Sequence, residues 1–179
     1  MPPTSPPSEL NSQFDPEHIV AILRRHEVKY LLVGGVACRL YGARRATSDL
    51  DLVPSGELDN LEQLARALRH LGARLRVGGI SQREIASLLI PLDGRTLRAF
   101  GTSTWMTNYG PVVVLLSMRT SPTRYETYSD LLQRASSVDL ETGPLLLASL
   151  DEIIASKSTA NRPKDRQVLP ELRRLRELS

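Results

Sequence analysis

The run from Gly34 to Val53 constrains the fold of this chain more than any other segment. It begins with two adjacent glycines, Gly34 and Gly35, which follow the apolar residues 31–33. The apolar stretch predicts a short buried strand. Glycine lets the backbone turn sharply and approach a ligand closely. We therefore expect a strand, a tight turn and a short helix over residues 36–41.

The same run ends in a second predicted strand, residues 49–53, which carries Asp49 and Asp51. Side chains alternate along a strand, so the two carboxylates point to the same face. Like charges repel there unless a cation lies between them. Mg2+ suits this arrangement because it binds through one or two carboxylates plus substrate phosphates. Either motif alone is usually only a turn or a solvated strand edge, so the combination carries the prediction.

This combination resembles the nucleotidyltransferase superfamily, in which a glycine pair and an Asp-x-Asp pair bind Mg2+ and a nucleoside triphosphate. A second segment, Ser149 to Asp165, resembles the Lys…Ala…Arg-x-Lys-Asp motif of the AbiE/MenT-type toxins, the nucleotidyltransferase halves of bacterial toxin–antitoxin pairs. The resemblance spans about residues 30–175. It implies an α/β fold of the polymerase beta-like type, with a mixed sheet, flanking helices and a short C-terminal helical segment.

The resemblance also implies a reaction and partners. Enzymes of this type transfer a nucleoside monophosphate from an NTP, here a pyrimidine nucleotide, to the 3′ end of tRNA and so block translation. Mg2+ is the expected cofactor, and NTP, tRNA and a cognate kinase-like antitoxin are the expected partners. Two alternatives stay open. One is an enzyme of the same fold that adenylylates a protein or a small molecule, and the other is a non-catalytic, nucleotide-binding antitoxin-like module.

The candidate site residues come from these two segments. Asp49 and Asp51 are the predicted metal ligands, and they join Lys157 and Asp165 as catalytic candidates. Asp165 is expected to orient Lys157 or an arginine, or to reach the site itself; it also fits a first-turn carboxylate favoured by the helix dipole. Four positive side chains would bind the triphosphate or stabilise charge on the leaving pyrophosphate: Arg44, Arg45, Lys157 and Arg162. The nucleotide-binding candidates are Gly34, Gly35, Arg44, Ser48, Lys157 and Arg162, with Arg45 as a further cation.

One position departs from the family pattern. Members place a third carboxylate on a later strand, in a Gly-x-x-Asp-x-Leu setting, and here Val113 stands at that place. Three explanations stay open. Asp165 or Asp93 substitutes for the missing carboxylate, or the enzyme works slowly with one metal ion, or the chain binds nucleotide without catalysis.

Two hydroxyls directly precede the carboxylate pair. The resemblance implies that a kinase-like antitoxin phosphorylates Thr47 or Ser48. A phosphate adds about −1.5 to −2 charge at neutral pH and would repel the incoming triphosphate. The alternative is that both hydroxyls only shape the loop.

Composition and charge restrict the number of domains, the cellular compartment and the partners that we expect. The chain has 179 residues and 41% hydrophobic content, enough for one domain with a good core. Its single cysteine excludes an intramolecular disulfide and fits the cytoplasm. No apolar run approaches the roughly 18 residues of a membrane span, so no membrane partner is expected. The net charge is +3, and residues 157–179 carry seven basic against three acidic side chains, which fits an RNA partner or a solvated helix face.

We expect a disordered leader over residues 1–11, a core over 12–148 and, over 149–179, a helical segment that completes the active site. Predicted helices cover residues 16–26, 55–71, 82–89, 125–136 and 163–176, and a further helix with Ser149 as its N-cap carries Lys157. Predicted strands cover residues 31–33, 49–53, 75–77, 96–100, 111–116 and 144–148. Residues 101–110 are expected to form a polar connection whose Trp105 stacks on a base or packs inward.

Overall fold

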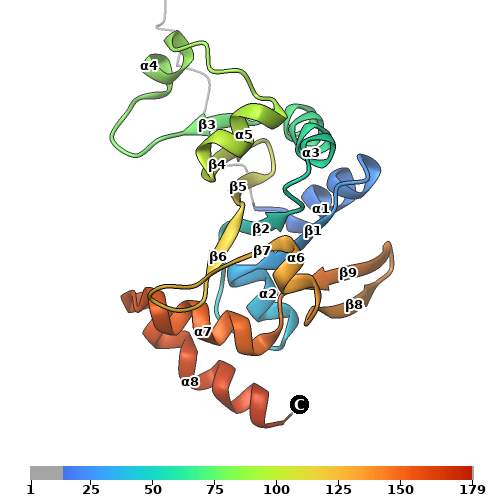
Figure 1. Cartoon of the computed structure of the whole chain (residues 1–179), viewed down its shortest axis with the longest axis vertical. Coiled ribbons are helices and arrows are strands. Elements are labelled where there is room, and N and C mark those ends of the chain that lie inside the picture. The colour runs from blue at the N-terminus through green and yellow to red at the C-terminus, as the bar shows by residue number, and fades with distance from the viewer. Residues whose placement is uncertain (1–13, 179) are drawn as a thin grey trace, which may run out of the picture.

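A computed structural model describes residues 14–178. Its centre is a mixed seven-stranded sheet in the order β3-β4-β5-β2-β1-β9-β8, and β6 and β7 form a separate ribbon (Figure 1). The strands are β1 (Tyr30–Val33), β2 (Leu50–Pro54), β3 (Arg74–Arg76), β4 (Thr102–Thr107), β5 (Gly110–Leu115), β6 (Ser117–Arg119), β7 (Tyr125–Thr127), β8 (Ser136–Leu140) and β9 (Gly143–Leu147). The helices are α1 (Pro16–Arg25), α2 (Gly34–Leu40), α3 (Leu58–His70), α4 (Gln82–Ser87), α5 (Gly94–Phe100), α6 (Tyr128–Leu132), α7 (Leu150–Ala160) and α8 (Pro163–Glu177).

The central strands are short and almost wholly apolar, as expected for strands covered on both faces. Every residue of β1 is buried, and β1 runs antiparallel to β2 and parallel to β9. β2 in turn runs parallel to β5. The predicted mixed sheet is thus confirmed.

Two helices begin at residues whose side chains cap the free backbone N–H groups of the first turn. Asp15 caps α1 by accepting a hydrogen bond from the His18 backbone N–H at 3.0 Å. Ser149 and Glu152 form a capping box at the start of α7. α8 packs against α7, and both lie at one end of the long axis, with β3, α4 and α5 at the other end (Figure 1). Within residues 14–178, no helix is long and apolar enough to cross a bilayer.

Two predicted elements are wrong. Residues 96–100 were predicted as a strand but belong to helix α5, because Asp93 accepts a hydrogen bond from the Thr96 N–H and starts a helix there. The predicted connection over 101–110 instead contains strand β4. Trp105 is buried in that strand and donates its indole N–H to Ser103 Oγ, so it packs inward.

The predicted helix over residues 125–136 is also largely wrong. Its first residues form β7, and only α6 is helical, because the Thr127–Asp130 capping box begins the helix late. Residues from Ser136 onward form β8, which pairs antiparallel with β9. The predicted leader, residues 1–11, lies outside the described residues.

Candidate active site

The glycine pair and the carboxylate pair meet at the ends of two neighbouring strands. β1 pairs with β2 so that Val33 lies opposite Asp51, and Gly34 follows directly with φ +66°. A Cβ on Gly34 would lie 2.0 Å from Asp51 Oδ2. The turn therefore requires glycine for two reasons, its left-handed backbone and the room it leaves for the carboxylate.

The second glycine, Gly35, lies against both Asp51 and the loop before β2. Its backbone N–H donates a hydrogen bond to the Asp51 carboxylate. A Cβ on Gly35 would lie 2.3 Å from Thr47 Oγ1. That hydroxyl is 3.3 Å from both the backbone oxygen and Oδ1 of Asp49. The loop before β2 is thus packed onto the glycine turn, and Ser48 beside it is exposed.

The protonation of Asp51 is shifted by its burial and by its neighbour Asp49. Burial, and then the neighbouring Asp49, raise the pKa of Asp51 to about 6. The Gly35 hydrogen bond and the charges of Lys157 and Lys164 oppose this rise. A buried carboxylate next to another carboxylate is a group that a bound cation would stabilise.

A cluster from α7 and α8 faces this pair. Asp165 is fully buried and accepts hydrogen bonds from Arg162 Nε at 2.7 Å and from Lys157 Nζ at 3.4 Å. Burial alone would raise the pKa of Asp165, but the hydrogen bond and charge of Arg162, with the charge of Lys157, hold it below its ordinary value. Asp165 is therefore an anion that positions two cations.

These groups surround one cavity of about 490 Å3. Its walls include Gly34, Gly35, Arg45, Thr47, Ser48, Asp49, Asp51, Lys157, Arg162 and Lys164. Two predicted site residues do not line it: Asp165, which lies behind the cations, and Arg44, whose backbone N–H bonds Glu171. Sequence reasoning did not propose Lys164 for the site. Its place in the Arg-x-Lys-Asp motif was the available signal.

The structure places Val113 directly beside the carboxylate pair. In the parallel β2–β5 ladder its register partner is Asp51, and both line the cavity. The proposed substitute Asp93 caps α5 and is not part of the cavity wall. Within residues 14–178, no cluster of three or more His, Cys, Asp or Glu side chains forms a metal site.

The donor set nevertheless fits one Mg2+. Asp49 and Asp51 supply carboxylate oxygens, and Mg2+ usually takes its remaining ligands from water and substrate phosphates. The nearby cations would bind phosphate oxygens. Two carboxylates alone leave most ligand positions of such an ion to water or to a bound anion.

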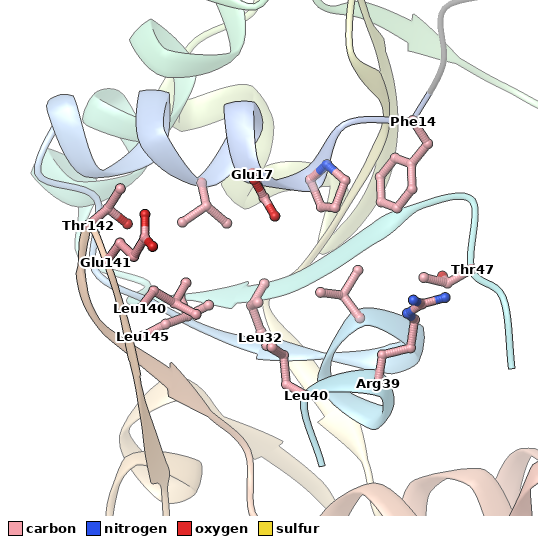
Figure 2. A pocket seen from close by; sticks show the side chains of 13 residues that line it. Phe14, Glu17, Leu32, Arg39, Leu40, Thr47, Leu140, Glu141, Thr142 and Leu145 are labelled. Atoms are coloured by element: carbon pink, nitrogen blue, oxygen red, sulfur yellow. The ribbon is translucent and has the colours of Figure 1, made fainter. Parts of the chain in front are cut away.

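A second cavity, of about 670 Å3, lies between α1, α2 and the β8–β9 hairpin (Figure 2). Its walls are mainly apolar and include Leu32, Leu40 and Leu145. Glu17 points into it from α1, and Thr47 lines both cavities. The two spaces therefore share a wall at the loop before β2.

Solved structures share this fold. The lincosamide antibiotic adenylyltransferase LnuA, with lincomycin bound, matches with TM-score 0.60 and 12% identity over 92% of this chain and 99% of that chain. ANT(2″)-Ia, in complex with adenylyl-2″-tobramycin, matches with TM-score 0.53 and 16% identity over 89% and 83%. A Thermotoga maritima protein assigned to the nucleotidyltransferases matches with TM-score 0.51 and 12% identity over 91% and 96%.

These matches show that the chain has the nucleotidyltransferase fold. No protein-family model and no curated protein sequence matches the chain.

Proposed function

We propose that this protein is a Mg2+-dependent nucleotidyltransferase of the AbiE/MenT toxin type. It would transfer a nucleoside monophosphate from an NTP, preferably a pyrimidine nucleotide, to the 3′ end of tRNA in the cytoplasm. The observation that carries the proposal is a carboxylate pair beside a glycine turn, faced by several cations across one cavity. That charge pattern suits a metal-bound triphosphate, whose transfer needs positioning and charge neutralisation more than covalent chemistry.

Each side chain has a role in this proposal. Asp49 and Asp51 would hold Mg2+, which supplies charge neutralisation for the triphosphate. Lys157 and Arg162 would bind phosphate oxygens and stabilise the negative charge that builds on the leaving pyrophosphate. Asp165 positions both cations through the hydrogen bonds described above.

The basic C-terminal segment supports an RNA acceptor. Arg173 and Arg174 are exposed on α8, next to the helix that carries Lys157. Contacts between such arginines and phosphates release counterions, so RNA affinity should fall as salt rises. Charge reversal of both arginines should flatten that dependence.

The direct test is a transfer assay. The protein is incubated with Mg2+, each α-labelled NTP in turn, and total RNA. We expect label on tRNA with one or two NTPs, and none with EDTA or with Asp51→Ala. Label on no RNA under any condition, from a protein that binds NTP, would overturn the proposed acceptor.

A second candidate is adenylyl transfer to a small molecule. Two of the matched folds are antibiotic adenylyltransferases, and the larger of the two cavities that share Thr47 has a mainly apolar lining with the acidic Glu17 and Glu141. An acidic, apolar cavity suits a cationic amphipathic acceptor. The same assay with lincomycin or tobramycin replacing RNA distinguishes the two acceptors, because only one class should become labelled.

We also propose that one hydroxyl before the carboxylate pair is the site of phosphorylation by an antitoxin. Ser48 is exposed, whereas Thr47 is half-buried against Gly35. The exposed hydroxyl is the more accessible to a kinase, so Ser48→Glu should block transfer while Ser48→Ala should not. Mass spectrometry of protein co-expressed with its antitoxin tests this. Blocked activity with both hydroxyls unmodified would point to inhibition by complex formation instead.

A further inference from the structure

The end of the molecule remote from α8 concentrates positive charge. We call residues 74–100, from β3 to the end of α5, the basic arm. It contains five arginines against two acidic residues, a net charge equal to that of the whole chain. Both acidic side chains already serve as helix caps, Glu84 for α4 and Asp93 for α5.

Most of the positive charge of the arm is available to a partner, although Arg98 donates a hydrogen bond to the Gly56 backbone oxygen at 2.8 Å and Arg76 Nη1 lies 3.9 Å from Met106 Sδ. Within residues 14–178, none of the five forms an ion pair. Arg74 and Arg76 lie two residues apart on β3, so they share a face of this edge strand. With Val77, Ile80 and other residues they line a hollow of about 440 Å3.

The arm also concentrates exposed apolar side chains. Five of the nine exposed large hydrophobic residues among residues 14–178 belong to it: Val77, Ile80, Leu88, Leu89 and Phe100. Leu89 is 86% exposed and has φ +47°, a left-handed conformation that leucine rarely adopts. Exposed apolar groups gathered in one region usually mark a protein interaction site. α4 projects furthest from the sheet at this end (Figure 1).

We propose that the basic arm is a docking surface for an acidic amphipathic segment of a partner protein. Glutamates or aspartates of that segment would pair with Arg74, Arg76 and Arg83. Its leucine-type side chains would cover Leu88 and Leu89. A polynucleotide would satisfy the arginines but leave the aliphatic side chains uncovered. The arm has a single aromatic residue, Phe100, on which a base could stack.

The test uses a fluorescein-labelled synthetic helix of about 16 residues, with leucines on one face and glutamates on the other. Fluorescence anisotropy should show binding that weakens as salt rises. Both the double variant Arg74→Glu/Arg76→Glu and the double variant Leu88→Ser/Leu89→Ser should weaken binding about tenfold or more. The matched control variants are Arg25→Glu and Leu132→Ser, which are exposed outside the arm and should bind as the wild type does.

Four results would overturn the proposal. The helix does not bind, or the arm variants bind it as the wild type does. A single-stranded RNA displaces it, which would make the arm a nucleic-acid surface. Sedimentation shows self-association that Leu88→Ser/Leu89→Ser abolishes, which would make the arm an interface between copies of the chain. The arm variants should keep nucleotide transfer unchanged, so this proposal and the proposed reaction fail separately.

Discussion

The two cavities that share Thr47 differ in size and in charge. The larger one, of about 670 Å3, has mainly apolar walls with Arg39, Glu17 and Glu141 as its charged groups. The smaller one, of about 490 Å3, joins two carboxylates to four cations. A triphosphate carries several negative charges and needs paired cations more than volume. Charge pattern, rather than size, is therefore the basis on which we propose the smaller cavity as the nucleotide site.

The largest expected effect is on transfer activity. Removing a residue that hydrogen-bonds a metal ligand typically lowers metal affinity or activity about 10–100-fold, so removing a ligand itself should cost more. We expect Asp49→Ala and Asp51→Ala each to lower kcat/KM by over about 100-fold. Leu40→Ala, in the apolar cavity, should leave transfer from NTP to RNA within a few-fold of wild type. An equal loss in all three variants would break the distinction between the cavities.

The next effect is on nucleotide affinity. Lys157→Ala removes a charged hydrogen-bond donor, which is worth about 1.5–3 kcal/mol, or roughly 10–100-fold in Kd. Arg39→Ala removes an exposed cation from the other cavity and should leave NTP affinity unchanged. Calorimetric titration with NTP in Mg2+ measures both. If Arg39→Ala weakens binding as much as Lys157→Ala, the nucleotide spans both cavities.

A smaller effect concerns stability. The pKa of Asp51 is raised from 3.8 to about 6, so the folded protein holds a proton that the unfolded chain has already released. This carboxylate therefore costs stability increasingly as pH rises from about 4 to 6, and the full cost persists above. Asp51→Asn should stabilise the metal-free protein by about 1–3 kcal/mol at pH 8 and by nothing near pH 4.

Urea denaturation of wild type and variant at the two pH values measures this difference. Glu17→Gln, which changes a carboxylate of the apolar cavity, is the control and should alter stability at neither pH. A destabilised Asp51→Asn at pH 8 would contradict the electrostatic account.

The features that the sequence predicted correctly are formed by residues that lie close together along the chain. The carboxylate strand and the Ser149 capping box involve residues close along the chain, and both form as expected. The two glycines do not form a separate turn but begin helix α2 directly after β1. The family resemblance implied that Val113 occupies the place of a third carboxylate, and the structure pairs Val113 with Asp51 across β2 and β5. The alternating polar residues 96–100 misled the strand prediction, because the decisive Asp93 cap lay just before them.

Other features depend on contacts between distant segments. The apolar cavity lies between α1, which contributes Glu17, and the β8–β9 hairpin, which contributes Glu141. The burial of Asp165 depends on how α8 packs against α7. No local pattern encodes either contact, since both arise only when the helices pack around the sheet.

The central claim is that Asp49 and Asp51 hold a divalent metal ion together with a nucleotide. Electron paramagnetic resonance with Mn2+ in place of Mg2+, and with a non-hydrolysable NTP, tests it most directly. The account predicts protein-bound Mn2+ in the wild type, with affinity that increases when the NTP analogue is present, and no such binding in Asp49→Asn/Asp51→Asn. Equal Mn2+ binding by wild type and the double variant would contradict it.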